Sequence, residues 1–388
     1  MNFRVYILAT ATVIVGLVEL IVGGILPVIA TDLNISIGSA GQLITVFALV
    51  YAISGPVLLS LTAKVERKKL YLISLFVFFI GNILTYFSTD FSYVMIARVI
   101  TAMSASLVIV LSLTLAAKSV QPAYQGKAIG VISMGISSSL VLGVPLGILV
   151  TNWFDWRTLF LGIALLTIIP FTLITIYIER IWVENVEPLS GQLKALGNIK
   201  IIGAHLAVVF MLAGHYTFYA YFTPFLESTL DLSGYWISVF YFLFGIAAVF
   251  GGGIGGSLAD HIGATKSMLI FIGSFAIVLF VLPYTTFFIP LFIIVMMIWG
   301  ALSWSNSPAT QSYLIQTDPV NSDIHQSLHN SAIQIGIALG SAVGGIVVEH
   351  QSSVGLTAPV GGGIVVIAFI CAVVSIALPK KEADRINL

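Results

Sequence analysis

The sequence predicts an all-α, polytopic membrane protein whose twelve transmembrane helices form two repeats of six. Of its 388 residues 59% are hydrophobic and only 8% are charged, whereas a soluble domain carries about 25% charged residues. The apolar residues form long continuous runs, and a helix needs about 20 of them to cross a bilayer. Residues of the first half also recur in the second half at a constant offset, since Pro27 corresponds to Pro224 (224 − 27 = 197).

The apolar runs give the expected spans in order. They cover residues 5–30, 38–61, 70–88, 92–117, 127–150, 157–178, 201–226, 234–257, 267–284, 287–313, 326–348 and 358–379. The first run is too long for the apolar part of a signal peptide and lacks a small-residue cleavage pattern, so we interpret it as a retained span. The continuous runs also exclude an outer-membrane barrel, whose strands alternate in polarity.

The longest polar connection, residues 179–200, separates a predicted six-helix bundle at 1–178 from a second one at 201–388. The offset of 197 pairs these halves, because Gly143 corresponds to Gly340 in the same way that Pro27 corresponds to Pro224. Both halves begin from the same side of the membrane, so the repeat axis is expected to run along the membrane normal.

The distribution of Lys and Arg predicts the orientation of the chain. With twelve spans, 14 of the 16 basic residues fall on the side of the two termini, and the exceptions are Arg98 within a span and Arg157 on the other side. Basic loops face the cytoplasm, so both termini are expected to be cytoplasmic and the protein to lie in a bacterial inner membrane. The 14 residues are Arg4, Lys64, Arg67, Lys68, Lys69, Lys118, Lys127, Arg180, Lys194, Lys200, Lys266, Lys380, Lys381 and Arg385.

Glu19 lies near the centre of the first apolar run. A charge at this depth costs about 2.5–3.5 kcal/mol on insertion scales, so an intramembrane carboxylate is a functional-site hypothesis by default. We interpret Glu19 as a proton-coupling residue, since burial favours the neutral form and allows the group to load and release a proton. The simpler alternative is a structural carboxylate that is paired with a backbone or hydroxyl group.

Three later spans carry polar or aromatic faces. His215 and Tyr219 are four residues apart in span seven, and Tyr216 occupies the place of Glu19 in the repeat. A polar stripe in a membrane helix is expected to face a cavity or another helix. Helix–helix hydrogen bonds remain the alternative to a role in solute binding. In span ten the stripe consists of Trp299, Ser303, Asn306, Thr310 and Tyr313, and in span eleven it consists of Asn330 and Gln334.

The loop Gly256–Lys266 reads GSLADHIGATK and resembles the G-x-L-A-D-x-x-G-x-x-K/R loop of the major facilitator superfamily. The resemblance implies that fold, with Asp260 and Lys266 as conformational latch residues. The first-half copy keeps Lys64 and Arg67 but departs from the family pattern, because Ala63 stands where the aspartate would be.

Two further motifs resemble the same superfamily. Tyr93–Arg98 resembles its span-four motif, whose arginine is associated with proton coupling. Arg98 is therefore a coupling candidate beside Glu19, or else a packing arginine that bonds carbonyls between spans. Span five resembles the glycine–proline motif of exporters, whose residues permit close packing and a bend. The motif residues are Gly135, Gly143, Pro145 and Gly147.

A closer resemblance joins Gly16–Ser36, Leu61–Leu72, Ala213–Thr217 and Trp299–Trp304 to one branch of the drug:proton antiporter-1 family. That branch exports purine bases and nucleosides, arabinose or chloramphenicol. In the superfamily, spans one, four, seven and ten line a central cavity. The implied solute-binding residues are His215, Tyr216, Tyr219, Trp299, Ser303, Asn306, Asn330 and Gln334.

These observations predict a proton-coupled antiporter that exports a purine base, a nucleoside or an analogue by alternating access. Aromatic faces can stack on a flat ring while amides bond its edge; the alternative is efflux of drugs or sugars. A passive channel would not need a buried carboxylate. An enzyme is disfavoured, because His325 and His329 are four apart without an H-E-x-x-H pattern, and the single cysteine, Cys371, excludes an internal disulfide. With no phosphate-binding loop, we expect no cofactor beyond the proton gradient. The expected partners are a small solute, protons and lipid, without nucleic acid, and the protein is expected to be monomeric.

Overall fold

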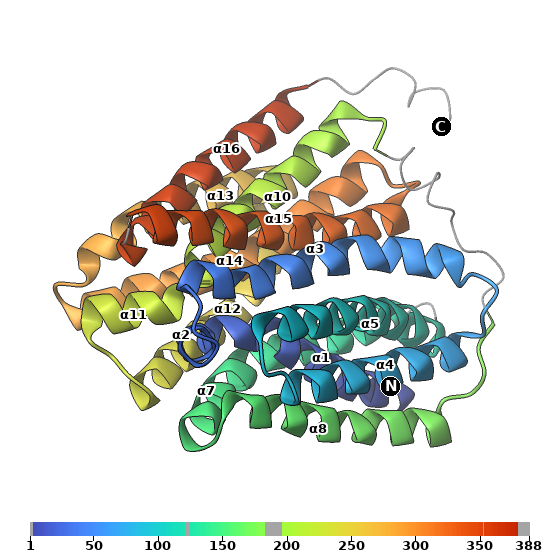
Figure 1. The fold of residues 1–388 in the computed structure, drawn as a ribbon. Helices are drawn as coiled ribbons and strands as arrows, with labels where there is room; N and C mark the ends of the chain where they lie inside the picture. Colours follow the sequence, from blue (N-terminus) through green and yellow to red (C-terminus); the bar gives the residue numbers. More distant parts are fainter. Residues whose placement is uncertain (1–2, 122–123, 183–195, 352, 379–388) are drawn as a thin grey trace.

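The computed structural model describes residues 3–121, 124–182, 196–351 and 353–378, and every regular element in these ranges is helical. Twelve of the described helices are long and apolar enough to cross a membrane. The all-helical class and the predicted number of spans are therefore confirmed. The helices lie side by side in one bundle (Figure 1).

The first six spans begin with α1 and end with α8. The elements of this part are α1 (Phe3–Gly24), α2 (Leu26–Asp32), α3 (Ile37–Leu61), α4 (Arg67–Tyr86), α5 (Phe91–Lys118), α6 (Gln125–Ser138), η2 (Ser139–Gly143), α7 (Val144–Trp153) and α8 (Trp156–Tyr177). Span five is composite, because a π-helical turn, η2, joins α6 to α7. Such turns often mark functional sites in membrane and soluble helices.

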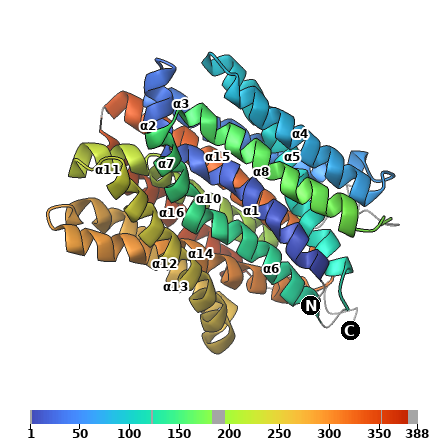
Figure 2. The same ribbon diagram turned by 90° about the horizontal axis from the view of Figure 1, so that it is seen from below.

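The last six spans begin with α10 and end with α16. The elements are α10 (Ile199–Tyr219), α11 (Phe222–Leu230), α12 (Tyr235–Ile262), α13 (Ala264–Val281), η3 (Leu282–Thr285), α14 (Ile289–Thr317), α15 (Ser322–Gln351), η4 (Val354–Leu356) and α16 (Thr357–Ala377). Figure 2 shows α4 and α8 on one flank of the bundle, α12 and α13 on the opposite flank, and α1 between them. The predicted division at 179–200 remains a prediction, and most of that segment lies outside the described residues.

The repeat is visible in the backbone after the short helices α2 and α11. Asn34 has φ 52° and Asp231 has φ 51°, and they are the non-glycine residues with positive φ in the described chain. Their numbers differ by the offset of the repeat (231 − 34 = 197). Asn and Asp tolerate the left-handed conformation better than most residues, so the two halves use the same turn chemistry at the same place.

The two ends of the bundle differ in charge. We call the end with the α3–α4, α5–α6, α12–α13 and α14–α15 connections the basic end, and the end with the α2–α3, α7–α8 and α15–α16 connections the acidic end. Lys64, Lys118 and Lys266 lie at the basic end, and Asp32 and Glu349 lie at the acidic end. Which end faces the cytoplasm remains a prediction. Four of the basic residues on which the predicted orientation depends lie outside the described residues, namely Lys194, Lys380, Lys381 and Arg385.

The first and last six spans meet mainly where α3 packs on α15 and where η2 and α7 pack on α12. At the acidic end Ser36 Oγ donates to the Glu349 carboxylate, and Thr223 Oγ1 donates to the Gly24 carbonyl at 3.1 Å. Closer to the basic end the two sets are joined by the hydrogen bond that Ser331 Oγ of α15 donates to the Ala52 carbonyl of α3 at 3.3 Å. The two sets of spans are thus closed together at the acidic end.

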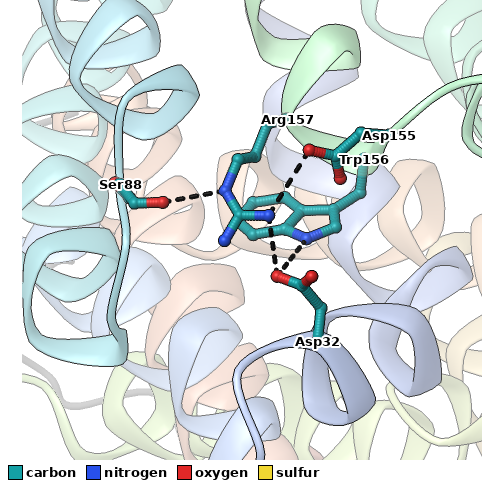
Figure 3. Close-up of polar contacts among 5 residues, drawn as sticks. All are labelled: Asp32, Ser88, Asp155, Trp156 and Arg157. Carbon is teal, nitrogen blue, oxygen red and sulfur yellow. Dashed lines mark hydrogen bonds and ion pairs between the residues drawn. The ribbon is translucent and has the colours of Figure 1, made fainter.

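A polar network at the acidic end fixes the first six spans to one another (Figure 3). Arg157 Nη1 lies 2.7 Å from Asp32 Oδ2 and 3.4 Å from Asp155 Oδ2, and its Nε donates to the Ser88 carbonyl at 2.8 Å. The guanidinium also lies over the Trp156 ring, whose indole N–H donates to Asp32. One arginine outside the basic end therefore ties α2 and the α4–α5 connection to the start of α8.

Candidate functional site: a central cavity

A cavity of about 260 Å³ lies between the two sets of spans. Ligand pockets typically measure about 300–1,000 Å³, so this cavity suits a small solute. Its lining comes from α1, α3, α5, α6 and η2 on one side and from α10, α12, α14 and α15 on the other. Every span that the superfamily resemblance places around the cavity therefore contributes a lining residue.

The two walls of the cavity differ in chemistry. On the wall from the first six spans, Glu19, Tyr51 and Ser133 are the polar side chains among the described lining residues, and the others are aliphatic. The opposite wall is rich in amides, hydroxyls and imidazoles. Its polar residues are His215, Tyr216, Tyr219, Ser303, Asn306, Ser307, Gln311, Gln326, His329, Asn330 and Gln334. Neither wall presents a Lys or Arg among these described residues, so the lining suits a neutral or cationic solute.

Glu19 joins the two walls. Gln334 Nε2 of α15 donates to Glu19 Oε1 of α1 at 2.6 Å, and a hydrogen bond to a carboxylate is stronger than one between neutral groups. Gln334 Oε1 has no partner among the described residues. The carboxylate is therefore in the cavity, as the sequence predicts, and it holds the first and last six spans together at mid-depth.

Arg98 lies behind this wall rather than on it. Its Nη1 donates to the Val18 carbonyl at 2.9 Å and its Nε to the Leu43 carbonyl at 3.3 Å. The guanidinium is 4.1 Å from the centre of the Phe47 ring. Its charge acts on Glu19 through space, but no ion pair links the two among the described contacts. This geometry favours a packing arginine that fixes α5 to α1 and α3.

His215 is the centre of an aromatic cluster from α10, α12, α13 and α14. Its ring stacks on Tyr219 with centroids 5.1 Å apart, and it lies 5.3 Å from the Trp299 ring. Trp299 is fully buried against Phe244 and does not line the cavity. His215 Nδ1, the Tyr219 hydroxyl and the Trp299 indole N–H have no partner in the described chain. The first two belong to residues that line the cavity, although the atoms themselves are buried.

The polar stripe of span ten divides between two environments. Ser303 and Asn306 line the cavity, and Asn306 Oδ1 has no partner among the described residues. Thr310 is buried outside the lining, and the Tyr313 hydroxyl donates to the Ser375 carbonyl of α16 at 3.2 Å. Both expected roles of the stripe, solute binding and helix–helix bonding, are thus represented on one helix.

The sequence-based site omitted several lining residues. Gln326 is one of them, and it precedes the predicted residues Asn330 and Gln334 at intervals of four along α15; all three line the cavity. This spacing was a usable signal, because residues four apart share a helix face. His329 and Tyr51 also line the cavity. His329 is four residues after His325, a spacing that we considered only for an enzyme, whereas Tyr51 stands in an apolar context that gives no such periodicity.

The exporter-type motif of span five packs on α1. A side chain at Gly135 would meet Thr12, one at Gly143 would meet Leu17, and one at Gly147 would meet Ile21. The glycines therefore let α6, η2 and α7 approach the helix that carries Glu19, and the π-helical turn η2 lies within this contact. Pro145 is the second residue of α7, a position where a missing N–H is tolerated.

The predicted latch residues at the basic end are not joined in this structure. Lys64, Asp260 and Lys266 are exposed and form no hydrogen bond or ion pair with described residues. Arg67 is buried, and its Nη1 lies 3.4 Å from the Thr62 carbonyl. Their role as a latch stays a prediction. Across the described residues, no three His, Cys, Asp or Glu side chains are grouped to hold a metal ion.

A bundle of twelve membrane helices around a polar cavity is the architecture of a solute transporter. The chain matches the family model described as the Major Facilitator Superfamily over residues 8–322, and it belongs to this superfamily. It is thus a multi-pass membrane transporter. Membership of the drug:proton antiporter-1 family and likeness to its purine-exporting branch remain predictions.

Similar proteins span nearly the whole chain. YbcL of Bacillus subtilis, an uncharacterised transporter of the same type, is 32% identical over 386 residues, which cover 100% of this chain and 99% of YbcL. A probable sugar efflux transporter of Helicobacter acinonychis is 26% identical and covers 94% of this chain and 93% of its own. The solved structure of a bacterial homologue of the lysosomal transporter Spinster, described as inward-facing and occupied, has a TM-score of 0.80 at 14% identity. It covers 96% of both chains and shows the shared fold.

Proposed function

We propose that the protein is a proton-coupled efflux transporter that exports a small neutral solute by alternating access, with a purine base or nucleoside as the leading candidate. The observation that carries the proposal is the hydrogen bond from Gln334 to Glu19 across the cavity. A carboxylate at this depth can carry a proton, and its partner belongs to the opposite wall. Protonation would therefore change a contact between the two moving parts.

The proposed cycle follows from the donor and acceptor properties of the two groups. An ionised Glu19 only accepts hydrogen bonds, so it suits the amide N–H of Gln334; a protonated Glu19 also donates. A solute that bonds Gln334 would compete with Glu19 for the same amide. Proton and solute would then occupy the cavity alternately, as antiport requires.

The closed acidic end is compatible with the proposed export. If the basic end faces the cytoplasm, the contacts of Glu349 with Ser36 and of Thr223 with Gly24 close the outer side. Solute would then be loaded from the cytoplasm. This arrangement supports export, with the proton gradient as the energy source and no bound cofactor in the proposed mechanism.

The cavity wall supports a solute with a polar edge and an apolar face. Asn306, Asn330 and Gln334 offer amide donors and acceptors, and Tyr216 and Tyr219 offer ring surfaces. Neutral purines have both features. Phosphorylated solutes do not suit the site, because no Lys or Arg is present among the described lining residues to balance a phosphate.

A sugar is the second candidate. Relatives that are 25–26% identical to this chain are named probable sugar efflux transporters. The hydroxyls of a pentose could bond the same amides, and its C–H face could lie on the aliphatic wall. The choice between the two solutes depends on whether ring stacking on Tyr216 and Tyr219 contributes to binding.

The test measures uptake into everted membrane vesicles that contain the protein. Labelled adenine, guanine and hypoxanthine are compared with labelled arabinose and with adenosine monophosphate, with and without a protonophore. We expect the wild-type protein to accumulate a purine in response to the gradient and to accumulate no monophosphate. The Glu19→Gln variant should lose the accumulation of the purine. Glu227→Gln is the control, because Glu227 is an exposed carboxylate of α11 outside the cavity.

Each result has a defined meaning. If arabinose alone accumulates, the exported solute is a sugar and the purine proposal is wrong. A wild-type protein that concentrates no solute in response to the gradient would contradict proton coupling. A Glu19→Gln protein that concentrates solute at the wild-type rate would remove Glu19 from the coupling role.

A further inference from the structure

A second group of ionisable side chains lies at the basic end of α10, α14 and α15, apart from Glu19. His205 of α10 and His325 of α15 have ring centroids 5.9 Å apart. Asp318 is the residue directly after α14, and its Oδ2 lies 2.9 Å from His325 Nε2. One turn further along α15, His329 Nε2 lies 3.2 Å from Ser307 Oγ. We call His205, His325, His329 and Asp318 the histidine cluster.

The imidazoles of the histidine cluster are buried but incompletely paired. Their exposed fractions are 6% for His205 and 1% for both His325 and His329. Both ring nitrogens of His205 lack a partner among the described residues, as does Nδ1 of His325 and of His329. Buried polar atoms are usually bonded, so four unpaired nitrogens in one cluster need an explanation beyond packing.

Asp318 supplies a fixed negative charge to the cluster. Partial burial would raise the pKa of its carboxyl group, but hydrogen bonds from Asn321 and His325 outweigh burial and lower that pKa. The carboxylate therefore stays ionised near neutral pH. It is also the part of the cluster nearest to solvent, with a side chain that is 23% exposed.

The charged or titratable groups that α12 and α13, which pack on α14, bring to this end are Asp260, His261 and Lys266, and all three are exposed. α3, which packs on α15, carries no Asp, Glu, Lys, Arg or His between Ile37 and Leu61. Lys200 Nζ donates to the Leu378 carbonyl, and the Tyr313 hydroxyl bonds Ser375. The other titratable groups on described parts of α10, α14, α15 and α16 lie at mid-depth, at the acidic end or on α16. They are His215, Tyr216, Tyr219, Glu349, His350 and Cys371.

We propose that the histidine cluster binds one exchangeable proton and forms a second proton site of the transporter beside Glu19, an inference that rests on the proposed proton coupling. A proton from water adds to an unpaired imidazole nitrogen, an N–H bond forms, and Asp318 balances the charge of the resulting imidazolium. Release returns the proton to water and restores the neutral ring. A second proton is opposed by repulsion between adjacent imidazolium rings.

The position of the cluster gives the second site access to both solvent and solute. Asp318 leads to the basic end, and His329 lines the cavity beside Ser307 and Gln311. His325 and Gln334 are nine residues apart on α15, or roughly 14 Å along a helix. One rigid helix therefore connects the histidine cluster to the partner of Glu19.

The first experiment detects the proton without any transport. Protein with ¹⁵N-labelled histidine is titrated between pH 5 and 8.5 in lipid nanodiscs and observed by NMR. We expect the three cluster histidines to take up one proton in total, and Asp318→Asn to lower that proton affinity by about tenfold or more. Asp260→Asn, an exposed aspartate at the same end, is the matched control and should leave the titration unchanged. Cluster rings that stay neutral over this range, or that titrate alike in Asp318→Asn, would overturn the proposal.

The second experiment counts protons per exported solute in proteoliposomes. His325→Asn and His205→Asn should retain solute exchange at equal concentrations while protons moved per solute fall by one. An unchanged ratio in both variants would refute the second site even if Glu19 couples transport. Absence of gradient-driven transport in the wild type would refute the proposed function instead, and the NMR titration would still decide whether the cluster binds a proton.

Discussion

The contact between α12 and α14 gives a quantitative prediction with an internal control. Gly251 lies against the backbone of α14, where an added Cβ would be 2.6 Å from Ala301 Cα. Gly252, the next residue, has nothing within 4 Å of the same hypothetical atom. Gly251→Ala and Gly252→Ala therefore make the same chemical change on one helix, in a closed and in an open environment.

The structure sets the size of the effect. Carbon atoms pack best at about 3.5–4.0 Å, and the Ala301 carbonyl oxygen would be nearer to the added Cβ than Cα is, so Gly251→Ala must move α12 and α14 apart by at least about 1 Å. That displacement strains the bond from Ser305 Oγ to the Gly251 carbonyl, which is 2.8 Å long. Overpacking of this kind costs about 1–3 kcal/mol. Ala in place of Gly in a helix returns up to about 1 kcal/mol, and this gain is common to both variants.

The assay is thermal unfolding of the purified protein in detergent, followed by tryptophan fluorescence. We expect Gly251→Ala to unfold several degrees below Gly252→Ala, on a scale of about 2–4 °C per kcal/mol, and Gly252→Ala to match or exceed the wild type. Gly255→Ala, whose Cβ would lie 2.6 Å from Ser305 Cα, should repeat the loss. Equal melting temperatures for Gly251→Ala and Gly252→Ala would refute the packing argument.

Three further predictions concern the acidic end, the basic end and the aromatic cluster. Arg157→Gln should lower the melting temperature, and Arg157→Lys should restore only part of it, because Lys cannot bond Asp32 and Ser88 in the same planar geometry; full rescue by Lys would contradict this. Burial of Glu66 is outweighed by backbone N–H donors that lower its pKa, so the stability it adds is present above about pH 4.3 and is lost as pH falls through the lowered value. Melting curves of wild type and Glu66→Gln should differ at pH 7 and converge in acid. Trp299→Ala should cost about 3–5 kcal/mol of stability and leave the KM for solute unchanged. Tyr216→Ala should raise that KM and also lower the melting temperature, because the Tyr216 ring is buried against His215 and Tyr219 as well as lining the cavity. A raised KM in Trp299→Ala would instead show that Trp299 belongs to the binding wall.

The twelve spans could be predicted because the bilayer imposes a length and a composition on every one of them. The repeat could be found for a similar reason: Asn34 and Asp231 adopt the same unusual backbone angle, and few residue types tolerate it. These features are local, so the residues that determine them are close together in the sequence.

The composition of the cavity wall could be predicted only in part. Trp299 and Ser303 are on one stripe of α14, yet Ser303 lines the cavity and Trp299 does not, because the packing of other helices decides how far the cavity extends along that face. The partner of Glu19 is 315 residues away in the sequence. The carbonyls bonded by Arg98 are backbone atoms, which no side-chain pattern reveals.

The unlike walls of the cavity have an evolutionary consequence under the proposed mechanism. The acid that handles the proton belongs to the first six spans, and most groups able to recognise a solute belong to the last six. Mutations in α10, α14 and α15 that spare Gln334 and the histidine cluster could then change the exported compound while proton coupling is kept. A chimera that receives its last six spans from a relative should take the substrate preference of the donor and keep its own dependence on Glu19.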